Sequence, residues 1–243
     1  MLELVPKPLR RLARRWIEGR GFIPASQGPA NIHTVMRRRS LPAVRTVIDV
    51  GASDGRWSRD MMGYYPEARY LLIEAQEKAH GQMSRKFQAE HKNVTLEFCA
   101  AGNKKGEINF DAADPFGGQA SQTAYSKNSV VVPMETVDGL VRKHGLVGPF
   151  LLKLDTHGWE VPIFEGAGET LSNCAVLIVE AYNFTLCPGC LRFHELCAYL
   201  EARGFRCLDV YDILVRPRDQ AFWQMDMVFI SASAPVFQVA EYR

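Results

Sequence analysis

Short apolar runs bounded by polar turns alternate with longer amphipathic stretches along most of the chain. The apolar runs are rich in β-branched and aromatic residues, as buried strands are. They lie at 47–50, 70–73, 94–99, 150–154, 176–179, 206–210 and 225–230. Helical patterns lie between them at 78–90, 159–171 and 191–203. Strands that alternate with helices predict an α/β protein with a doubly wound sheet.

The first apolar run leads into a turn that is typical of a nucleoside site. VIDVGASDGRW, residues 47–57, carries Asp49 near the end of its strand and turns at Gly51, and the next run, LLIEAQ, ends in Glu74. Gly51 can adopt the backbone angles of a tight strand-to-helix turn, and Glu74 is placed to accept from two ribose hydroxyls. Alternatively, the glycines form only a tight turn and Glu74 is a solvated strand end.

The turn lacks the features of a phosphate-binding motif. A dinucleotide site needs G-x-G-x-x-G, but Ser53 and Arg56 occupy the second and third glycine positions, and no P-loop ending is present. This disfavours a nucleotide-dependent oxidoreductase. S-adenosylmethionine fits better, because it lacks phosphate and carries an ammonium and a sulfonium that favour carboxylates such as Asp49 or Asp54.

A second motif, FLLKLDTHGWEVPIFEGA, covers residues 150–167. It predicts a buried strand ending at Asp155, a short turn, and a helix with Pro162 in its first turn. Asp155 and His157 would then project from the carboxyl edge of the sheet, where open α/β sheets bind ligands. The imidazole of His157 suits a general base at neutral pH, unless it only caps the helix or satisfies a loop carbonyl. Asp155 would orient the acceptor or the methionine moiety, Lys153 could stabilise a developing alkoxide, and Glu180 could also reach the acceptor.

Taken in order, these segments resemble the FkbM-type S-adenosylmethionine-dependent methyltransferases. The resemblance is carried by VIDVGASDGRW, LLIEAQ, VPMETVDGL, LLKLDTHGWE and LIVEAYNF, and extends from about Thr46 to Ile230. It implies a seven-stranded Rossmann-like sheet, mostly parallel with an antiparallel last strand, and O-methylation of a hydroxyl on a sugar or natural product. It also implies a set of cofactor-binding residues, namely Asp49, Gly51, Ala52, Ser53, Asp54, Trp57, Glu74, Ala75, Ala100, Ala101 and Asp155.

Two positions depart from the family pattern. Many relatives carry an acid just after the alanine pair at 100–101, where this chain has Gly102-Asn103-Lys104-Lys105. Many also carry glutamate where this chain has His157. The expected catalytic set of His157, Asp155 and Lys153 therefore rests on side-chain chemistry more than on the resemblance.

Composition narrows the class of partner. A chain of 243 residues that is 47% apolar and 23% charged is ordinary for one globular enzyme domain. A net charge of +2 without a basic stripe, and no Asn-Pro-Pro-Tyr-like motif, argue against a nucleic-acid or protein acceptor, and the resemblance implies a small-molecule hydroxyl instead. No run of eighteen apolar residues and no signal sequence is apparent, so we expect no membrane span and a cytoplasmic location.

The alternative to a methyltransferase enzyme is a non-catalytic cofactor-binding or regulatory module of the same fold. The oligomeric state is not indicated.

Two regions lie outside the strand–helix alternation. In residues 1–45, Leu9, Leu12 and Trp16 recur at helical spacing among arginines, which predicts a basic amphipathic helix packed on a domain formed by 46–243. A helix that binds a membrane surface or an acidic partner is the alternative. Residues 111–128, rich in glycine and serine, predict a loop that borders the acceptor pocket.

The segment CPGCLRFHELC contains Cys187, Cys190, His194 and Cys197, which are potential zinc ligands. Their spacing is shorter than zinc modules use, and Cys197 lies on an apolar helix face. We therefore expect no metal here and cysteines that serve packing, with a reactive or disulfide-forming pair as an alternative.

Overall fold

The computed structural model defines residues 31–125 and 127–241. Its main sheet is built from β1 (Thr46–Val50), β2 (Arg69–Ile73), β3 (Val94–Glu97), β8 (Phe150–Leu154), β9 (Cys174–Tyr182), β10 (Phe205–Val215) and β11 (Phe222–Ser231). The strands lie in the order β10-β11-β9-β8-β1-β2-β3. β11 runs antiparallel to both of its neighbours, whereas the pairs from β9 to β3 are parallel. The predicted doubly wound sheet with an antiparallel last strand is confirmed.

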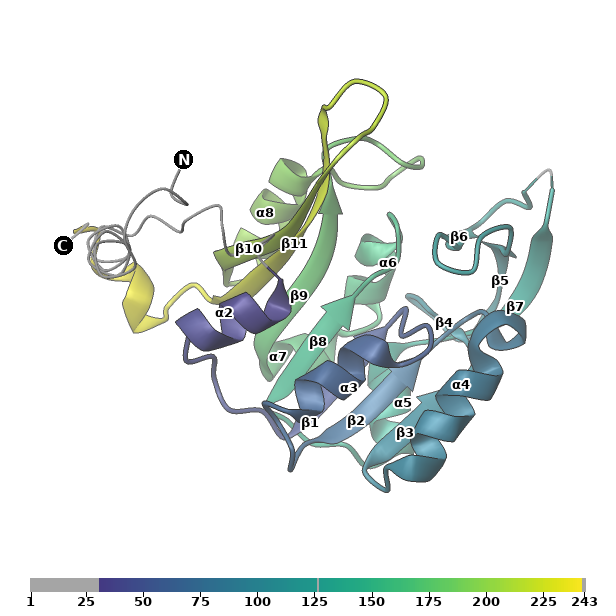
Figure 1. Ribbon diagram of the computed structural model, residues 1–243, viewed down its shortest axis with the longest axis horizontal. Coiled ribbons are helices and arrows are strands. Elements are labelled where there is room, and N and C mark those ends of the chain that lie inside the picture. The colour runs from purple at the N-terminus through teal and green to yellow at the C-terminus, as the bar shows by residue number, and fades with distance from the viewer. Residues whose placement is uncertain (1–30, 126, 242–243) are drawn as a thin grey trace, which may run out of the picture.

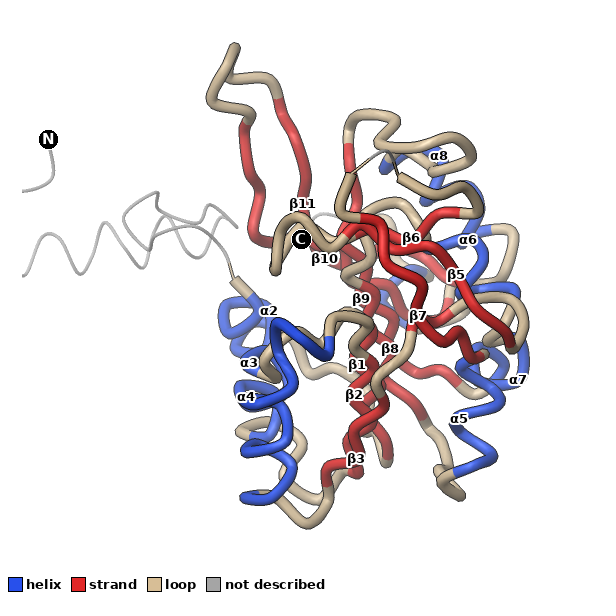
Figure 2. The backbone as a smooth tube through the Cα atoms, turned by 90° about the vertical axis from the view of Figure 1, so that its right-hand side faces the viewer, coloured by secondary structure: helices blue, strands red, loops and turns tan. Residues whose placement is uncertain are grey.

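Helices cover both faces of the sheet (Figures 1 and 2). One face carries α2 (Ile32–Arg38), α3 (Arg56–Met62) and α4 (Glu77–Glu90), and the other carries α5 (Val137–Lys143), α6 (Glu160–Glu165), α7 (Gly168–Ser172) and α8 (Phe193–Glu201). The central strands β1 and β8 are buried at every position, as parallel strands covered on both sides must be. None of the helices within the described ranges is long and apolar enough to cross a membrane.

A second sheet lies beyond the carboxyl end of β3 (Figure 1). It contains β4 (Ala100–Ala101), β5 (Gly106–Asp111), β6 (Gln119–Ser121) and β7 (Ser129–Glu135) in the order β4-β7-β5-β6. The sequence predicts a loop over residues 111–128, yet β6 lies within it and pairs with β5. These strands are short and bury only one face, so tertiary pairing rather than a strong local pattern forms them.

Sequence and structure differ at one predicted helix. The helix expected over residues 159–171 ends at Glu165 and resumes at Gly168 as α7. Gly166 lies against the backbone of Gly102, and a Cβ there would approach the Gly102 carbonyl oxygen to 2.0 Å. The close approach of two backbones therefore divides the helix.

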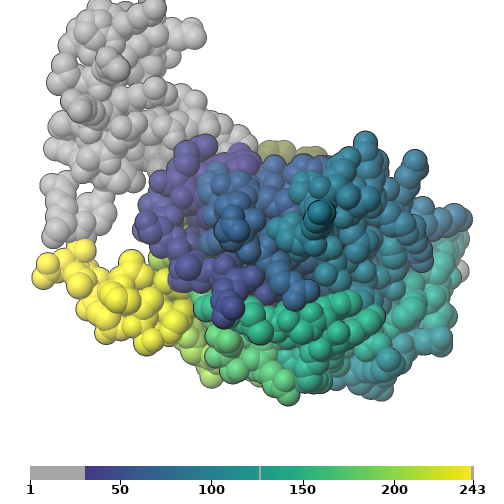
Figure 3. All heavy atoms as spheres, turned by 90° about the horizontal axis from the view of Figure 1, so that it is seen from below, coloured from purple at the N-terminus to yellow at the C-terminus, as the bar shows by residue number. Residues whose placement is uncertain are grey.

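The described part of the N-terminal region packs on the sheet. Ile32 and Val35 of α2 are buried in the core cluster on the α3 and α4 face, while Arg38 and Arg39 pair with Asp209 of β10 at 3.0 and 3.3 Å. The last described segment, with the 3-10 helix η3 (Pro235–Phe237), joins the same cluster and lies beside α2 (Figure 3). The basic helix predicted around Leu9 to Trp16 falls outside the described residues.

The central strand β8 provides a test of this core. Leu152 is fully buried, whereas Leu214 in β10 is 51% exposed. Leu152→Ala should lower the free energy of unfolding by about 2–5 kcal/mol, because truncation leaves a cavity. The same truncation at Leu214 should stay within about 0.5 kcal/mol. Urea denaturation followed by circular dichroism measures both, and equal losses would contradict the assigned core.

Candidate active site

A cavity of about 620 Å³ lies at the carboxyl edge of the main sheet. This volume is in the range of small-molecule and cofactor pockets. Nine of the eleven predicted cofactor residues line it, and so do all three predicted catalytic residues. Asp155 belongs to both sets. The lining predicted residues are Gly51, Ala52, Ser53, Trp57, Glu74, Ala75, Ala100, Ala101, Lys153, Asp155 and His157.

Gly51 forms the turn after β1 for a steric reason. Its φ is 77°, and its N–H donates to the carbonyl of Ile73 at 2.9 Å. A Cβ at this position would lie 2.0 Å from the carbonyl oxygen of Asp155. Only glycine therefore lets the first motif approach the second so closely.

Glu74 joins the two loops that form one wall of the cavity. Its two carboxylate oxygens accept from the backbone N–H groups of Ser53 at 2.7 Å and Gln76 at 2.6 Å. Burial raises the pKa of this carboxyl, and the two N–H donors oppose that rise. Each carboxylate oxygen keeps a lone pair for a further donor, so the geometry fits a ribose diol.

Two predicted cofactor residues, Asp49 and Asp54, do not line the cavity. Asp49 is fully buried beneath it, where it accepts from the Ser58 hydroxyl at 2.7 Å. Asp54 binds the Arg56 guanidinium at 2.8 and 2.9 Å, and this pairing lowers its pKa. The acids that line the cavity are instead Asp60, Glu74, Asp155, Glu180, Asp212 and Asp226.

Lys153 is a buried cation among carboxylates. Its ammonium lies 3.0 Å from Asp155 and 3.4 Å from Asp49, and 5.3 Å from the centre of the Trp57 ring. Burial alone would lower the pKa of Lys153, but Asp155, Asp49 and Asp226 raise it above its ordinary value. The ammonium is thus held charged and directed at Asp155, whose pKa it lowers against the effect of burial.

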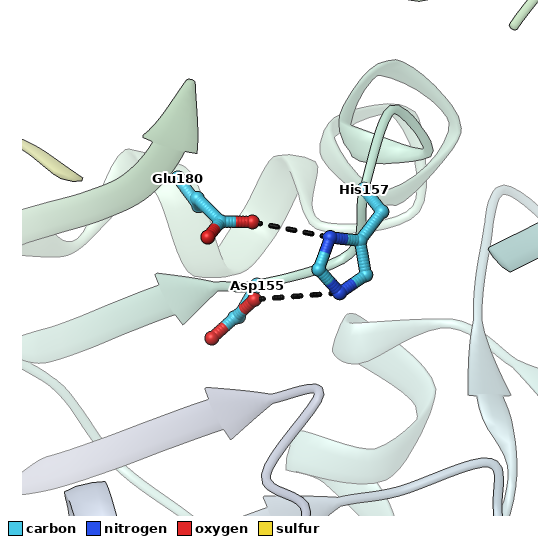
Figure 4. A group of neighbouring side chains, drawn as sticks. All are labelled: Asp155, His157 and Glu180. Atoms are coloured by element: carbon cyan, nitrogen blue, oxygen red, sulfur yellow. Dashed lines mark ion pairs between the residues drawn. The ribbon is translucent and has the colours of Figure 1, made fainter. Parts of the chain in front are cut away.

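His157 lies between two carboxylates, from Asp155 and Glu180 (Figure 4). Its Nδ1 is 3.2 Å from Glu180 and 2.6 Å from the Tyr182 hydroxyl, and its Nε2 is 3.8 Å from Asp155. Burial opposes the charged imidazole, but Glu180 and Asp155 outweigh it and raise the pKa of His157 to about 9. In this arrangement the imidazole is protonated at neutral pH.

Further acids face the same end of the cavity. Asp226 of β11 lies directly across from Glu180 of β9 in the antiparallel register. Burial and the carboxylates of Glu180, Asp155 and Asp212 raise the pKa of Asp226 to about 8, although Lys153 acts in the opposite direction. Sequence reasoning missed Asp226, which a lone acid in the apolar run MDMVFI could have indicated.

Three side chains hold the loop at 114–116 over the cavity. Gln76 donates to the carbonyls of Asp114 and Pro115, both at 3.0 Å. A ring nitrogen of His80 lies 2.6 Å from the Pro115 carbonyl oxygen, and Nε2 of His157 lies 3.1 Å from that of Phe116. The loop borders the cavity as predicted. The three side chains that hold it are distant in sequence from residues 114–116, and no sequence motif links them to the loop.

The cysteine segment packs beneath the second motif. Cys190 is buried, and its sulfur accepts from the N–H groups of Leu186 and Cys187 at 2.9 and 3.1 Å. A Cβ at Gly158 would lie 3.0 Å from the Cys187 sulfur, so the pair fills space against the turn. Within the described ranges, the group close enough to share a metal ion is Asp155, His157 and Glu180, and it includes none of the four potential ligands of the cysteine segment.

Comparison with known protein families identifies one match. The family described as "Methyltransferase FkbM domain" matches residues 49–207, more than half of the chain. The chain matches none of the curated proteins with which it was compared.

Several solved structures are similar. An FkbM methyltransferase from Methylobacillus flagellatus KT is 15% identical with a TM-score of 0.48, covering 75% of this chain and 43% of that chain. This chain therefore spans less than half the length of that protein. A SAM-dependent methyltransferase from Aquifex aeolicus is 12% identical with a TM-score of 0.44, covering 86% and 94%. The O-methyltransferase NcsB1 from neocarzinostatin biosynthesis, solved with S-adenosylhomocysteine and 1,4-dihydroxy-2-naphthoic acid, is 10% identical with a TM-score of 0.43, covering 82% and 53%. At TM-scores below 0.5 these likenesses do not bear on the substrate.

The sheet order, the antiparallel last strand and the glycine turn opposite Glu74 define a Rossmann-like fold of the methyltransferase type. The chain belongs to the FkbM methyltransferase family. S-adenosylmethionine is accordingly the cofactor, as the sequence predicts.

Glu74 provides a direct test of the cofactor wall. Glu74→Ala should weaken S-adenosylhomocysteine binding by about 2 kcal/mol, roughly thirty-fold, because two ribose hydroxyls lose their acceptor. Titration calorimetry measures the change, with Glu77→Ala as control because Glu77 pairs with Arg85 on the surface of α4. Unchanged affinity in a folded Glu74 variant, or preferential binding of NAD, would contradict the site.

Proposed function

We propose that this enzyme methylates a hydroxyl oxygen of a small molecule, a sugar or a natural product, in the cytoplasm. The observation that carries the proposal is the cluster of Asp155, His157 and Glu180 at the end of a cavity whose other wall presents Glu74. Glu74 thus supports recognition of the cofactor ribose on one side of the cavity, and the cluster supports recognition of the acceptor hydroxyl on the other. The net charge of +2 and the absence of a basic stripe in the sequence favour a small acceptor over a nucleic acid.

The cavity walls support binding of the cofactor in three parts. Glu74 suits the ribose, and the small side chains of Ala100 and Ala101 leave space for an adenine ring. Asp155, held by Lys153, suits the ammonium of the methionine moiety. When bound, S-adenosylmethionine supplies a methyl group on a sulfonium to a nucleophilic oxygen in line with it.

His157 is the residue to which we assign activation of the hydroxyl. As the acceptor oxygen bonds to the methyl carbon and the carbon–sulfur bond breaks, the hydroxyl proton must leave, and His157 is placed to accept it. An imidazolium cannot act as a base. The pKa of His157 falls, however, when a positive charge such as the sulfonium is brought beside it. Lys153 is committed to Asp155 and Asp49, so we assign it to positioning Asp155 rather than to the alkoxide.

The proposal divides the chain into a catalytic domain, residues 46–243, and an N-terminal extension, residues 1–45. Burial of Ile32 and Val35 in the core supports an extension that packs on the domain.

The deciding experiment is a screen of sugars and hydroxylated natural products with methyl-labelled cofactor. Transfer of label to a hydroxyl oxygen, located by mass spectrometry, is the expected outcome. Tight cofactor binding without transfer to any acceptor class would favour a regulatory module instead.

His157 tests the chemical step once an acceptor is found. His157→Ala should lower turnover by about 100-fold or more, the usual contribution of a group that assists proton transfer. The affinity for S-adenosylhomocysteine should change less than about threefold. His194→Ala, on the exposed side of α8, is the matched control and should leave both values unchanged. Near-normal turnover in the His157 variant would make it a turn residue.

A further inference from the structure

We propose that Asp155, His157 and Glu180 bind a divalent cation of the Mn²⁺ or Mg²⁺ type. The sequence predicts no metal, because the three residues are separated along the chain and form no ligand motif. The fold brings them together. Asp155 follows β8, His157 lies in the turn after it, and Glu180 is near the end of the neighbouring strand β9.

The ligand atoms are close enough to share one ion. One atom from each of the three residues lies within 4.8 Å of the others. In an octahedral site with bonds of about 2.1 Å, neighbouring ligands are about 3.0 Å apart and opposite ones about 4.2 Å. Nδ1 of His157 lies 3.2 Å from Glu180, whereas the 3.8 Å contact to Asp155 is made by Nε2. Nε2 also lies 3.1 Å from the carbonyl oxygen of Phe116, so Nδ1 is the nitrogen available to an ion and the contact of Nε2 would orient the ring.

Charge supplies a second, independent reason for a cation. Asp226 lies directly opposite Glu180 across an antiparallel pair, so both carboxylates are on one face of the sheet. A divalent ion beside Glu180 would interact favourably with both acidic side chains.

The donor set indicates the kind of ion. Carboxylate oxygens suit Mg²⁺ and Mn²⁺, and one imidazole is compatible with Mn²⁺. The cavity continues past the cluster, so positions on the ion remain open to another oxygen ligand. Tyr182 and Gln224 each donate to Glu180 and would hold its carboxylate in place as an outer layer.

The catalytic consequence rests on the proposed function, but binding of the ion does not. An ion at the acceptor end would hold the hydroxyl oxygen and lower the pKa of that hydroxyl, so that its proton passes more easily to water. With the ion bound, His157 acts as a ligand and the ion takes over the activation that the imidazole alone would provide.

The test measures Mn²⁺ binding to the full chain by electron paramagnetic resonance and calorimetry, after treatment with a chelator and without an acceptor. One saturable Mn²⁺ per chain is expected, with displacement by Mg²⁺. Glu180→Gln keeps the side-chain shape and His157→Gln keeps a polar side chain without the imidazole, and each should weaken binding at least tenfold. A folded variant is verified by unchanged affinity for S-adenosylhomocysteine to within about threefold.

Glu97→Gln is the matched control. Glu97 pairs with His144 and with Lys143 at 2.7 Å, a carboxylate–histidine contact without a third ligand, and it does not line the cavity. Its Mn²⁺ affinity should equal that of the unaltered chain. No saturable binding at millimolar Mn²⁺, or equal binding in every variant, would overturn the cation site. If the unaltered chain does not bind S-adenosylhomocysteine, that result would instead overturn the proposed function.

Discussion

The buried ammonium of Lys153 joins the two motifs that build the site. It lies in β8, opposite Asp49 of β1 in the parallel register, and it contacts both Asp49 and Asp155. A charge buried without partners would be very costly, so the two carboxylates and the ammonium must stay together. This constraint aligns β1 with β8 and fixes where the carboxyl edge of each strand ends. The turn after β1 and the second motif are therefore positioned by one ionic cluster, whose Lys153 and Asp155 line the cavity.

Backbone sterics complement this ionic contact. Gly51 passes so near the carbonyl of Asp155 that no side chain fits between them. His157, two residues after Asp155, has a backbone φ of 52°, which is an uncommon conformation for a residue with a side chain. The turn is held by Glu160, whose carboxylate accepts from the Gly158 N–H at 2.9 Å and the Thr156 hydroxyl at 3.1 Å. These contacts direct the imidazole into the space between Asp155 and Glu180 (Figure 4).

The electrostatics of the cavity divide it into two ends. Glu74 stands at one end, already bonded to two backbone N–H groups and open to further donors. At the other end Glu180, Asp226 and Asp155 line the cavity, together with the protonated imidazole of His157 and the ammonium of Lys153. A positively charged ligand would interact favourably with the acids at this second end. The sulfonium of the cofactor and the proposed cation both satisfy that requirement.

Much of the fold could be predicted because the signals for it are local. The seven strands of the main sheet are short apolar runs with polar ends, and Gly51 and Glu74 directly follow β1 and β2, as the two apolar runs predict. The second sheet could not be predicted in this way, since β5, β6 and β7 bury one face and depend on each other for pairing. The helix at 159–171 was divided by a contact with Gly102, which no local pattern encodes.

The sequence by itself determined the sheet, the family and the positions of the two motifs, because strand periodicity and turn chemistry act over a few residues. Only the tertiary structure decided what those residues do to one another. It removed Asp49 and Asp54 from the cavity by pairing them with Ser58 and Arg56. It also placed Asp226 across from Glu180 and surrounded His157 with carboxylates. Charges and pKa values depend on distances between side chains, and folding alone sets those distances.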